Sequence, residues 1–114
     1  MESLKGKHVK VFISLPMSGR TAEEINAEYE KIKAVAKKVF VDDTVEFIDQ
    51  RRPDSDAPKD IVDKGHISVW HMSLDIGLMA EADVVIFSKN YLNSKGCRIE
   101  EKVATDYGMH TIYM

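Results

Sequence analysis

Two acidic residues in the second half of the chain have surroundings that suit catalytic carboxylates. Glu100 comes four residues after Gly96, in the first turn of an expected helix, and the adjacent Glu101 points about 100° away from it. Asp75 lies in an apolar stretch, where a carboxylate is unfavourable without a partner or a task. One carboxylate can act as a nucleophile while a second donates a proton. The alternative is that Glu100 only complements the helix dipole and that Asp75 is solvated or caps a helix.

Two loops have the composition of anion-binding segments. They are "SLPMSGR" (14–20) and "SKNYLNSKG" (88–96), both rich in small hydroxyl residues and glycine, and each leads into an expected helix. Free N–H groups and the positive dipole end at a helix start favour an anion. Arg20 adds a charge-assisted contact to a phosphate or carboxylate. The alternative is that these residues only turn the chain and that Arg20 is solvated.

Other chemistries receive less support from the residues. Cys97 is the single cysteine and no histidine is placed as its base, so we interpret its thiol as inert. The four histidines include no pair four residues apart, and no Walker or dinucleotide motif is present, so we expect no metal and no cofactor. Trp70, His71 and Tyr91 either form a stacking wall for a base or, as we favour, belong to the core.

Length and charge limit the classes of protein and partner. The 114 residues fit one domain, 1–114, with 44% hydrophobic and 31% charged residues. The net charge of −3 argues against polymeric nucleic acid as a partner. The N-terminal segment has no apolar signal core and no run reaches membrane-spanning length, so we expect a cytoplasmic protein that does not bind membranes.

The elements that must position these residues alternate along the chain. Strands are expected over 8–14, 44–49, 82–88 and 109–114, and helices over 21–40, from about Ile67, and over 97–108, with loops at 50–60 and 89–96. Thr21 and Glu24 form a capping box that starts the first helix. This alternation predicts a flavodoxin-like α/β fold, a doubly wound parallel sheet of about four strands in the order 2-1-3-4 with helices on both faces.

The predicted strand order places the two anion-binding loops together. Ligands of such sheets bind beyond the carboxyl ends of the strands where the order reverses, which here is between segments 14–20 and 88–97. Because both loops converge there, we favour the binding interpretation and expect Asp75 and Glu100 to line the crevice. Four strands also leave apolar helix surface uncovered, so we expect a homodimer or higher oligomer, with the helix of Trp70 to Met79 as the contact surface.

Three segments, in this order and spacing, resemble the nucleoside 2-deoxyribosyltransferase superfamily, which includes nucleotide N-glycosidases. They are "FISLPMSGRT", "SLDIGLMAEADVVIF" and "SKGCRIEEKVATDYG", and they are closest to a small uncharacterised phage and bacterial branch of that superfamily. The resemblance covers most of the chain, with 50–66 as its weakest part. It implies a single domain with a nucleoside or nucleoside monophosphate as the ligand.

The resemblance also implies roles for individual residues. Glu100 matches the glutamate that attacks the anomeric carbon of the sugar, and Asp75, eight residues before Asp83, matches the aspartate that activates the leaving base or positions the nucleophile. The implied substrate-binding residues are Phe12, Ser14, Ser18, Gly19, Arg20, Ser88, Ser94 and Gly96. The family usually has a tyrosine at the position of Phe12 and a glycine at that of Leu15.

These matches imply cleavage or transfer at an N-glycosidic bond. Breaking this bond builds positive charge on the sugar, which a carboxylate stabilises or traps as a covalent glycosyl intermediate. Water as the acceptor gives hydrolysis and a second base gives transfer, and the sequence leaves the choice open. Two other hypotheses remain: a non-catalytic nucleotide-binding module, favoured by Phe12 and Leu15, and a flavodoxin-like redox protein, which the small number of aromatic residues disfavours.

Overall fold

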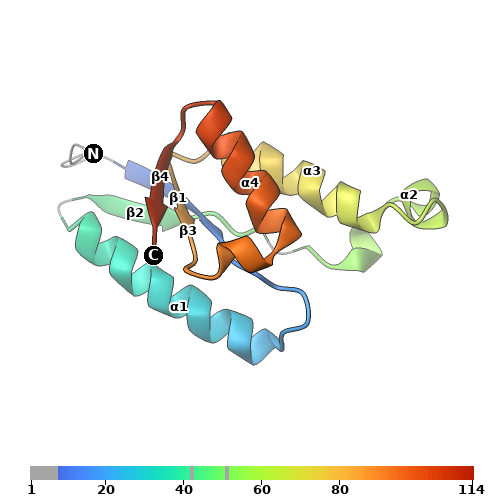
Figure 1. Ribbon diagram of the computed structural model, residues 1–114, viewed down its shortest axis with the longest axis horizontal. Coiled ribbons are helices and arrows are strands. Elements are labelled where there is room, and N and C mark those ends of the chain that lie inside the picture. The colour runs from blue at the N-terminus through green and yellow to red at the C-terminus, as the bar shows by residue number, and fades with distance from the viewer. Residues whose placement is uncertain (1–7, 42, 51) are drawn as a thin grey trace.

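Four parallel strands form one sheet in the order β2-β1-β3-β4 (Figure 1). The computed structural model describes residues 8–41, 43–50 and 52–114. The strands are β1 (His8–Ser14), β2 (Thr44–Phe47), β3 (Val84–Phe87) and β4 (His110–Tyr113). The predicted flavodoxin-like α/β architecture and strand order are therefore confirmed, and the order reverses between β1 and β3.

The register of β1 and β3 brings the starts of the two candidate loops together. Ser14, the last residue of β1, pairs with Phe87, the last residue of β3. The backbone N–H of Ser88 then donates to the carbonyl of Ser14 at 2.9 Å. Both residues are buried. Segments 14–20 and 88–96 therefore leave the sheet side by side.

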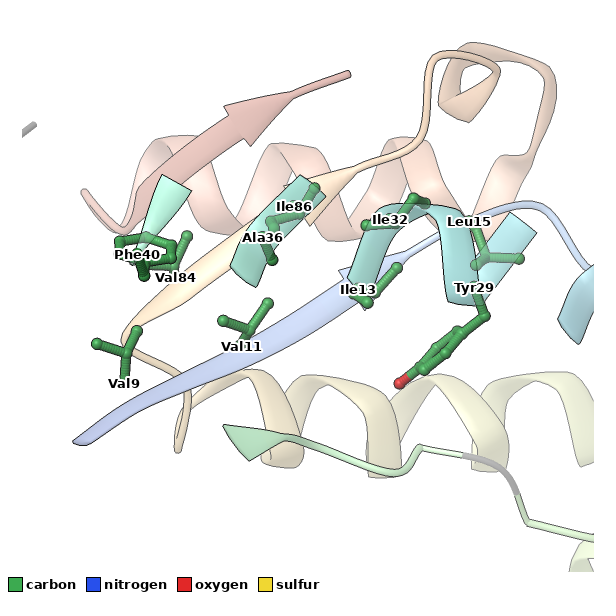
Figure 2. Close-up of a cluster of buried hydrophobic side chains, with 10 residues drawn as sticks. All are labelled: Val9, Val11, Ile13, Leu15, Tyr29, Ile32, Ala36, Phe40, Val84 and Ile86. Atoms are coloured by element: carbon green, nitrogen blue, oxygen red, sulfur yellow. The ribbon is translucent and has the colours of Figure 1, made fainter. Parts of the chain in front are cut away.

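Helices cover the two faces of the sheet unequally. Helix α1 (Ala22–Val39) lies on one side, whereas α3 (Ile67–Met79) and α4 (Lys95–Asp106) lie on the other (Figure 1). Figure 2 shows the core beneath α1, in which strand residues such as Val11 and Ile13 face Ile32 and Ala36. The core on the other face contains Phe12, Ile48, Met79, Val85, Phe87 and Ala104. The side chains of β1 alternate between the two cores, as the period of a strand requires.

Local signals at the start of α1 act as the sequence predicts. The hydroxyl of Thr21 accepts from the N–H of Glu24 at 3.1 Å, and the Glu24 carboxylate accepts from the N–H of Thr21 at 3.0 Å. This capping box satisfies two N–H groups that the helix would otherwise leave free. Helix α1 therefore begins directly after the first candidate loop.

Helix α3 is apolar around most of its circumference, but only Met79 is fully buried. Val69 is 67% exposed although it lies in the first turns of the helix. A helix with apolar residues on every face is normally covered by other protein or by lipid. Within residues 8–41, 43–50 and 52–114, no helix is long and apolar enough to cross a membrane.

Several predicted boundaries differ from the structure. The strands expected at 44–49 and 82–88 are shorter, and α4 begins at Lys95 rather than at Cys97, because Ser94 caps it by accepting from the N–H of Cys97 at 3.3 Å. Short helices interrupt the loops predicted at 50–60 and 89–96, namely η1 (Asp54–Asp56) and η2 (Tyr91–Asn93), and α2 (Lys59–Asp63) begins where the first of these loops is predicted to end. Proline is the N-cap residue of two of them, Pro53 of η1 and Pro58 of α2.

Replacing Ile32 by alanine should strongly destabilise the protein. Ile32 is 2% exposed in the core beneath α1, so the substitution leaves a cavity and should lower the free energy of unfolding by about 2 to 5 kcal/mol. Val35→Ala, on the same helix but at a position that is 38% exposed, should change it by less than about 1 kcal/mol. Urea denaturation measures both, and equal losses would contradict this assignment of the core.

Candidate active site

Glu100 lies against the end of β1. It is 5% exposed and lies on the buried face of α4, three residues after Cys97 and four before Ala104. The hydroxyl of Ser14 donates to its Oε1 at 2.6 Å. Glu101 points elsewhere and accepts from the hydroxyls of Thr105 and Tyr113, both at 2.8 Å. The two adjacent acids therefore diverge, as their helical spacing predicts.

Asp75 on α3 is within hydrogen-bonding reach of Glu100 on α4. Burial, and then the hydrogen bond and negative charge of Asp75, raise the pKa of Glu100 to about 8, although the hydrogen bond from Ser14 opposes this shift. Burial also raises the pKa of Asp75. Two carboxyl groups this close cannot both ionise readily, so the pair holds one proton near neutral pH.

Cys97 lies beside this carboxyl pair without the properties of a reactive thiol. It is 3% exposed, and burial raises its pKa despite hydrogen bonds with Ser14 and Ser94. The negative charges of Glu100 and Glu28 raise the pKa further. A thiol in these surroundings stays protonated at neutral pH, which agrees with its interpretation as inert.

Arg20 and Ser88 are joined by Glu28, a residue that the sequence analysis did not single out. Arg20 Nη1 donates to Glu28 Oε1 at 2.6 Å and to the carbonyl of Pro16 at 2.7 Å. The Ser88 hydroxyl donates to Glu28 Oε2 at 2.7 Å and accepts from the N–H of Asn90 at 3.1 Å. Burial favours a higher pKa for Glu28, but the hydrogen bonds from Ser88 and Arg20 hold the pKa below its ordinary value. This network ties α1 to both loops.

The position of Glu28 in the sequence contained a usable signal. It lies three residues after Ile25 and four before Ile32, on the apolar stripe of α1. A charged residue on the stripe that faces a core needs a partner there. Its partners come from segments far away in the sequence, so the pattern alone could not identify them.

A polar crevice lies where the strand order reverses. It has a volume of about 350 Å³ and is lined by Pro16, Ser18 and Arg20 on one side and by Asn90 and Asn93 on the other. These residues belong to the two loops predicted to bound it. A second hollow of about 440 Å³ lies on the α1 side of Arg20 and is lined by Arg20, Glu24, Ala27, Glu28, Lys31, Ile32, Ser88, Lys89, Asn90 and Met114. Neither lining includes Asp75 or Glu100, which differs from the expectation that both acids line the crevice.

The remaining predicted substrate-binding residues have structural roles. Phe12 is fully buried in the core under α3 and α4, so its side chain does not reach the crevice. Gly19 has a φ of +74° in a turn that the N–H of Arg20 closes on the carbonyl of Met17 at 3.2 Å, which explains a glycine there. Ser94 caps α4.

Gly96 lies in the first turn of α4, close to α3. A Cβ at this position would meet the Cε atom of Met72 at 3.4 Å, so Gly96 leaves room for that methionine. Met72 precedes Asp75 on α3 by three residues, one helical turn. Helices α3 and α4 therefore approach each other closely here, which also places Asp75 of α3 beside Glu100 of α4.

Gln50 is a further buried polar residue near the site. It is 7% exposed, and its Nε2 donates to the carbonyl of Ile13 at 2.6 Å. Its Oε1 is buried and has no hydrogen-bond partner among the described residues. The only sequence signal for Gln50 is its place just beyond the strand predicted at 44–49. Its unpaired oxygen makes it a candidate ligand contact.

The described part of the chain contains no group of three or more histidine, cysteine, aspartate or glutamate residues arranged to hold a metal ion. A carboxyl pair that shares a proton can provide a nucleophile or an anion together with a proton donor.

The fold and site define a flavodoxin-like α/β protein with a largely buried carboxyl pair at its switch point. The chain belongs to the family described as Domain of unknown function (DUF4406), whose model matches residues 9–113. Comparison with curated proteins and with solved structures gives no match. The family description names no activity, so a functional conclusion depends on the geometry of the site.

The raised pKa of Glu100 predicts a pH-dependent stability. Because the pKa lies at about 8 in the folded protein against an ordinary 4.5, the stabilisation is complete below about pH 4.5 and is lost as the pH rises through about 8. The free energy of unfolding, measured with urea, should therefore fall between pH 5 and 9, by an amount on the order of a few kcal/mol. Glu100→Gln cannot ionise and should remove most of this fall. Glu101→Gln is the matched control and should retain it, and an unchanged fall in Glu100→Gln would show that Glu100 is not the group responsible.

Proposed function

We propose that this protein cleaves or transfers at the N-glycosidic bond of a nucleoside or nucleoside monophosphate, with Glu100 as the nucleophile. The observation that supports this proposal best is the pair formed by the buried Glu100 and the half-buried Asp75, with Ser14 hydrogen-bonded to Glu100, at the end of the sheet where such folds bind ligands. The resemblance to the nucleoside 2-deoxyribosyltransferase superfamily assigns the same two acids to this chemistry.

The proposed reaction uses both carboxyl groups. As the bond between C1′ of the sugar and the base nitrogen breaks, its electron pair leaves with the base and Asp75 donates a proton to the base. The carboxylate of Glu100 forms a bond to C1′, which gives a glycosyl ester. Water or a second base then attacks C1′, Glu100 leaves as a carboxylate, and the proton released by the attacking group returns to Asp75.

This chemistry requires the form of the pair in which Asp75 holds the proton and Glu100 is ionised, which is the minor form at neutral pH because the pKa of Glu100 is raised to about 8. Burial and mutual repulsion keep one proton on the pair near neutral pH. The hydrogen bond from Ser14 favours the ionised form of Glu100, since a hydroxyl donor stabilises a carboxylate. Ser14 therefore stabilises the reactive form of Glu100, although burial and Asp75 outweigh it, so base release should rise as the pH approaches about 8.

The crevice between the two loops would hold the substrate. Ser18, Arg20, Asn90 and Asn93 offer hydrogen bonds to the sugar or its phosphate. Because Glu100 is only 5% exposed, the substrate must part the two loops to bring C1′ to its carboxylate. For the loops to part, the hydrogen bonds of Glu28 to Arg20 and to Ser88 would have to break.

The alternative is a non-catalytic nucleotide-binding module. Two observations favour it: Glu100 is almost inaccessible, and Phe12 is buried without the hydroxyl that tyrosine supplies in the family it resembles. In that case the carboxyl pair stabilises the packing of α3 against α4 and the crevice only binds.

Replacing Glu100 by glutamine tests the proposed activity. Wild-type protein should release free base from one or more members of a panel of nucleosides and nucleoside monophosphates. Glu100→Gln should slow this release by about a hundredfold to a thousandfold or more, because the amide can neither attack C1′ nor stabilise positive charge. Nucleotide binding, measured by calorimetry, should remain largely unchanged.

Glu101→Gln is the matched control, because its side chain faces Thr105 and Tyr113 instead of the pair. It should retain the wild-type rate of base release. Equal, small effects of both substitutions would refute the assignment of Glu100. Binding by the wild type with no base release from any substrate would favour the binding module.

We also propose that the protein forms a homodimer or higher oligomer through α3. Its apolar residues, with Val69 67% exposed, form the kind of surface that a second copy covers. Light scattering at high micromolar concentration should give a mass above that of one chain. Val69→Asp should lower this mass towards that of the monomer, whereas Val41→Asp, at a 77% exposed position outside α3, should not. A monomer mass for the wild type would contradict the proposal.

A further inference from the structure

Glu28 lies between two residues that could otherwise bind an anion from a ligand. Arg20 Nη1 donates to Glu28 Oε1 at 2.6 Å, and the Ser88 hydroxyl donates to Glu28 Oε2 at 2.7 Å. The side chains of Glu28 and Arg20 are 17% and 25% exposed, and Ser88 is 1% exposed. A guanidinium and a hydroxyl that donate to the two oxygens of one group are the donors with which proteins bind carboxylates and phosphates. The anion held there belongs to the chain itself.

We propose that Glu28 is a specificity residue whose carboxylate occupies the place of a ligand phosphate, so that the crevice selects a ligand with an uncharged sugar. The inference rests on the proposed function for the class of ligand, since it favours the nucleoside over the nucleoside monophosphate. The occupation of the anion position by Glu28 is a property of the protein without ligand and can be tested without any activity.

The hydrogens that Arg20 and Ser88 would offer to a phosphate are already used. An Nη atom of arginine carries two hydrogens, and those of Arg20 Nη1 go to Glu28 and to the carbonyl of Pro16 at 2.7 Å. The one hydroxyl hydrogen of Ser88 also goes to Glu28. When the loops part to admit a ligand, Glu28 remains attached to α1 beside these donors and competes with a phosphate at a high effective concentration. An uncharged sugar does not enter this competition.

The charges around the crevice favour the same selection. Burial by itself would raise the pKa of Glu28, but the hydrogen bonds from Ser88 and Arg20 hold this pKa below its ordinary value, so the carboxylate is charged at neutral pH. A phosphate monoester brings a charge of about −1.5 to −2 at pH 7 and would be repelled by it. Lys31 and Lys89 line the second hollow and do not line the crevice, so they offer no replacement cation there.

The remaining lining of the crevice suits a sugar. Arg20 is the one charged residue among the described residues that line it, and Glu28 compensates its charge. The others are Pro16, Ser18, Asn90 and Asn93. Hydroxyl and amide groups both donate and accept hydrogen bonds, as the hydroxyl groups of a sugar require.

The first test is whether an added anion replaces the Glu28 carboxylate. Glu28→Ala leaves the guanidinium of Arg20 and the hydroxyl of Ser88 facing the space of the lost carboxylate. Sodium formate should therefore raise the melting temperature of Glu28→Ala in a saturable way, compared with sodium chloride at the same ionic strength. Wild-type protein, in which the position is filled, should show no saturable rise.

Glu30→Ala is the matched control for this test. It removes another acid from the same helix, one that is 72% exposed and lies 3.5 Å from Lys33, without touching Arg20 or Ser88. It should respond to formate as the wild type does. An equal response of Glu28→Ala and wild type, or no response of a folded Glu28→Ala, would overturn the proposal.

Glu28→Gln tests the selection directly and keeps the size of the side chain, so it decides the question even if Glu28→Ala does not fold. The measurement is calorimetry with inorganic phosphate and with a panel of nucleosides and their 5′-monophosphates. Wild-type protein should bind nucleosides more tightly than their monophosphates. Glu28→Gln should shift this ratio towards the monophosphate by roughly tenfold to a hundredfold, the effect of a hydrogen bond to a charged group. An unchanged ratio, or a wild type that prefers the monophosphate, would overturn the proposal.

Inorganic phosphate decides the case in which no nucleoside binds. Binding of phosphate to Glu28→Gln and not to the wild type would support the role of Glu28. Binding to both proteins with equal affinity, or to neither, would overturn it.

Base release separates this inference from the proposed function. An active wild-type protein should have a higher kcat/KM for nucleosides than for their 5′-monophosphates, and Glu28→Gln should narrow the difference. A preference for nucleosides that is lost in Glu28→Gln, in a protein that releases no base, would support the role of Glu28 and refute the proposed chemistry. Base release with the same preference in the wild type and in Glu28→Gln would do the reverse.

Discussion

The burial of Glu100 beside the half-buried Asp75, between β1, α3 and α4, is the constraint on which the rest of this structure depends. Glu100 and Asp75 reach each other only because α3 and α4 lie on the same face of the sheet, and Glu100 reaches Ser14 only because α4 begins beside the end of β1. A buried ionised carboxylate without partners is strongly unfavourable, so the fold must supply a proton, a hydroxyl donor or both. Here the fold supplies both, because the pair holds a proton and Ser14 donates a hydrogen bond to Glu100. As a result, the pKa of Glu100 lies at about 8.

The second polar network maintains the geometry of the loops around this pair. Glu28 on α1 binds Arg20 from the first loop and Ser88 from the second, and each contact is between 2.6 and 2.7 Å. The charges of Arg20 and Glu28 compensate each other, so this part of the crevice rim is nearly neutral.

The unequal cover of the sheet explains where the surface is apolar. One helix covers the face that includes Val11 and Ile13, whereas two cover the face that includes Phe12. Helix α3 carries both a member of the carboxyl pair and the exposed Val69, so the same helix serves the site and the surface. A change in the packing of α3 would alter the distance between Asp75 and Glu100. The proposed assembly and the proposed chemistry are thus physically linked.

The sequence by itself determined the elements and their order. The buried runs of β1 and β3, the capping box at Thr21 and the right-handed crossovers act locally or through general rules, and they lead to one parallel order. It also separated Glu100 from Glu101, because the angle between neighbours on a helix is fixed. Only the tertiary structure decided the partners: Ser14 meets Glu100 across 86 residues, and Ser88 meets Glu28 across 60. No periodicity encodes contacts over such separations, since they depend on how helices dock and on which polar groups remain unpaired when they do. For the same reason, the sequence could not predict that Phe12 is buried or that Arg20 pairs with Glu28.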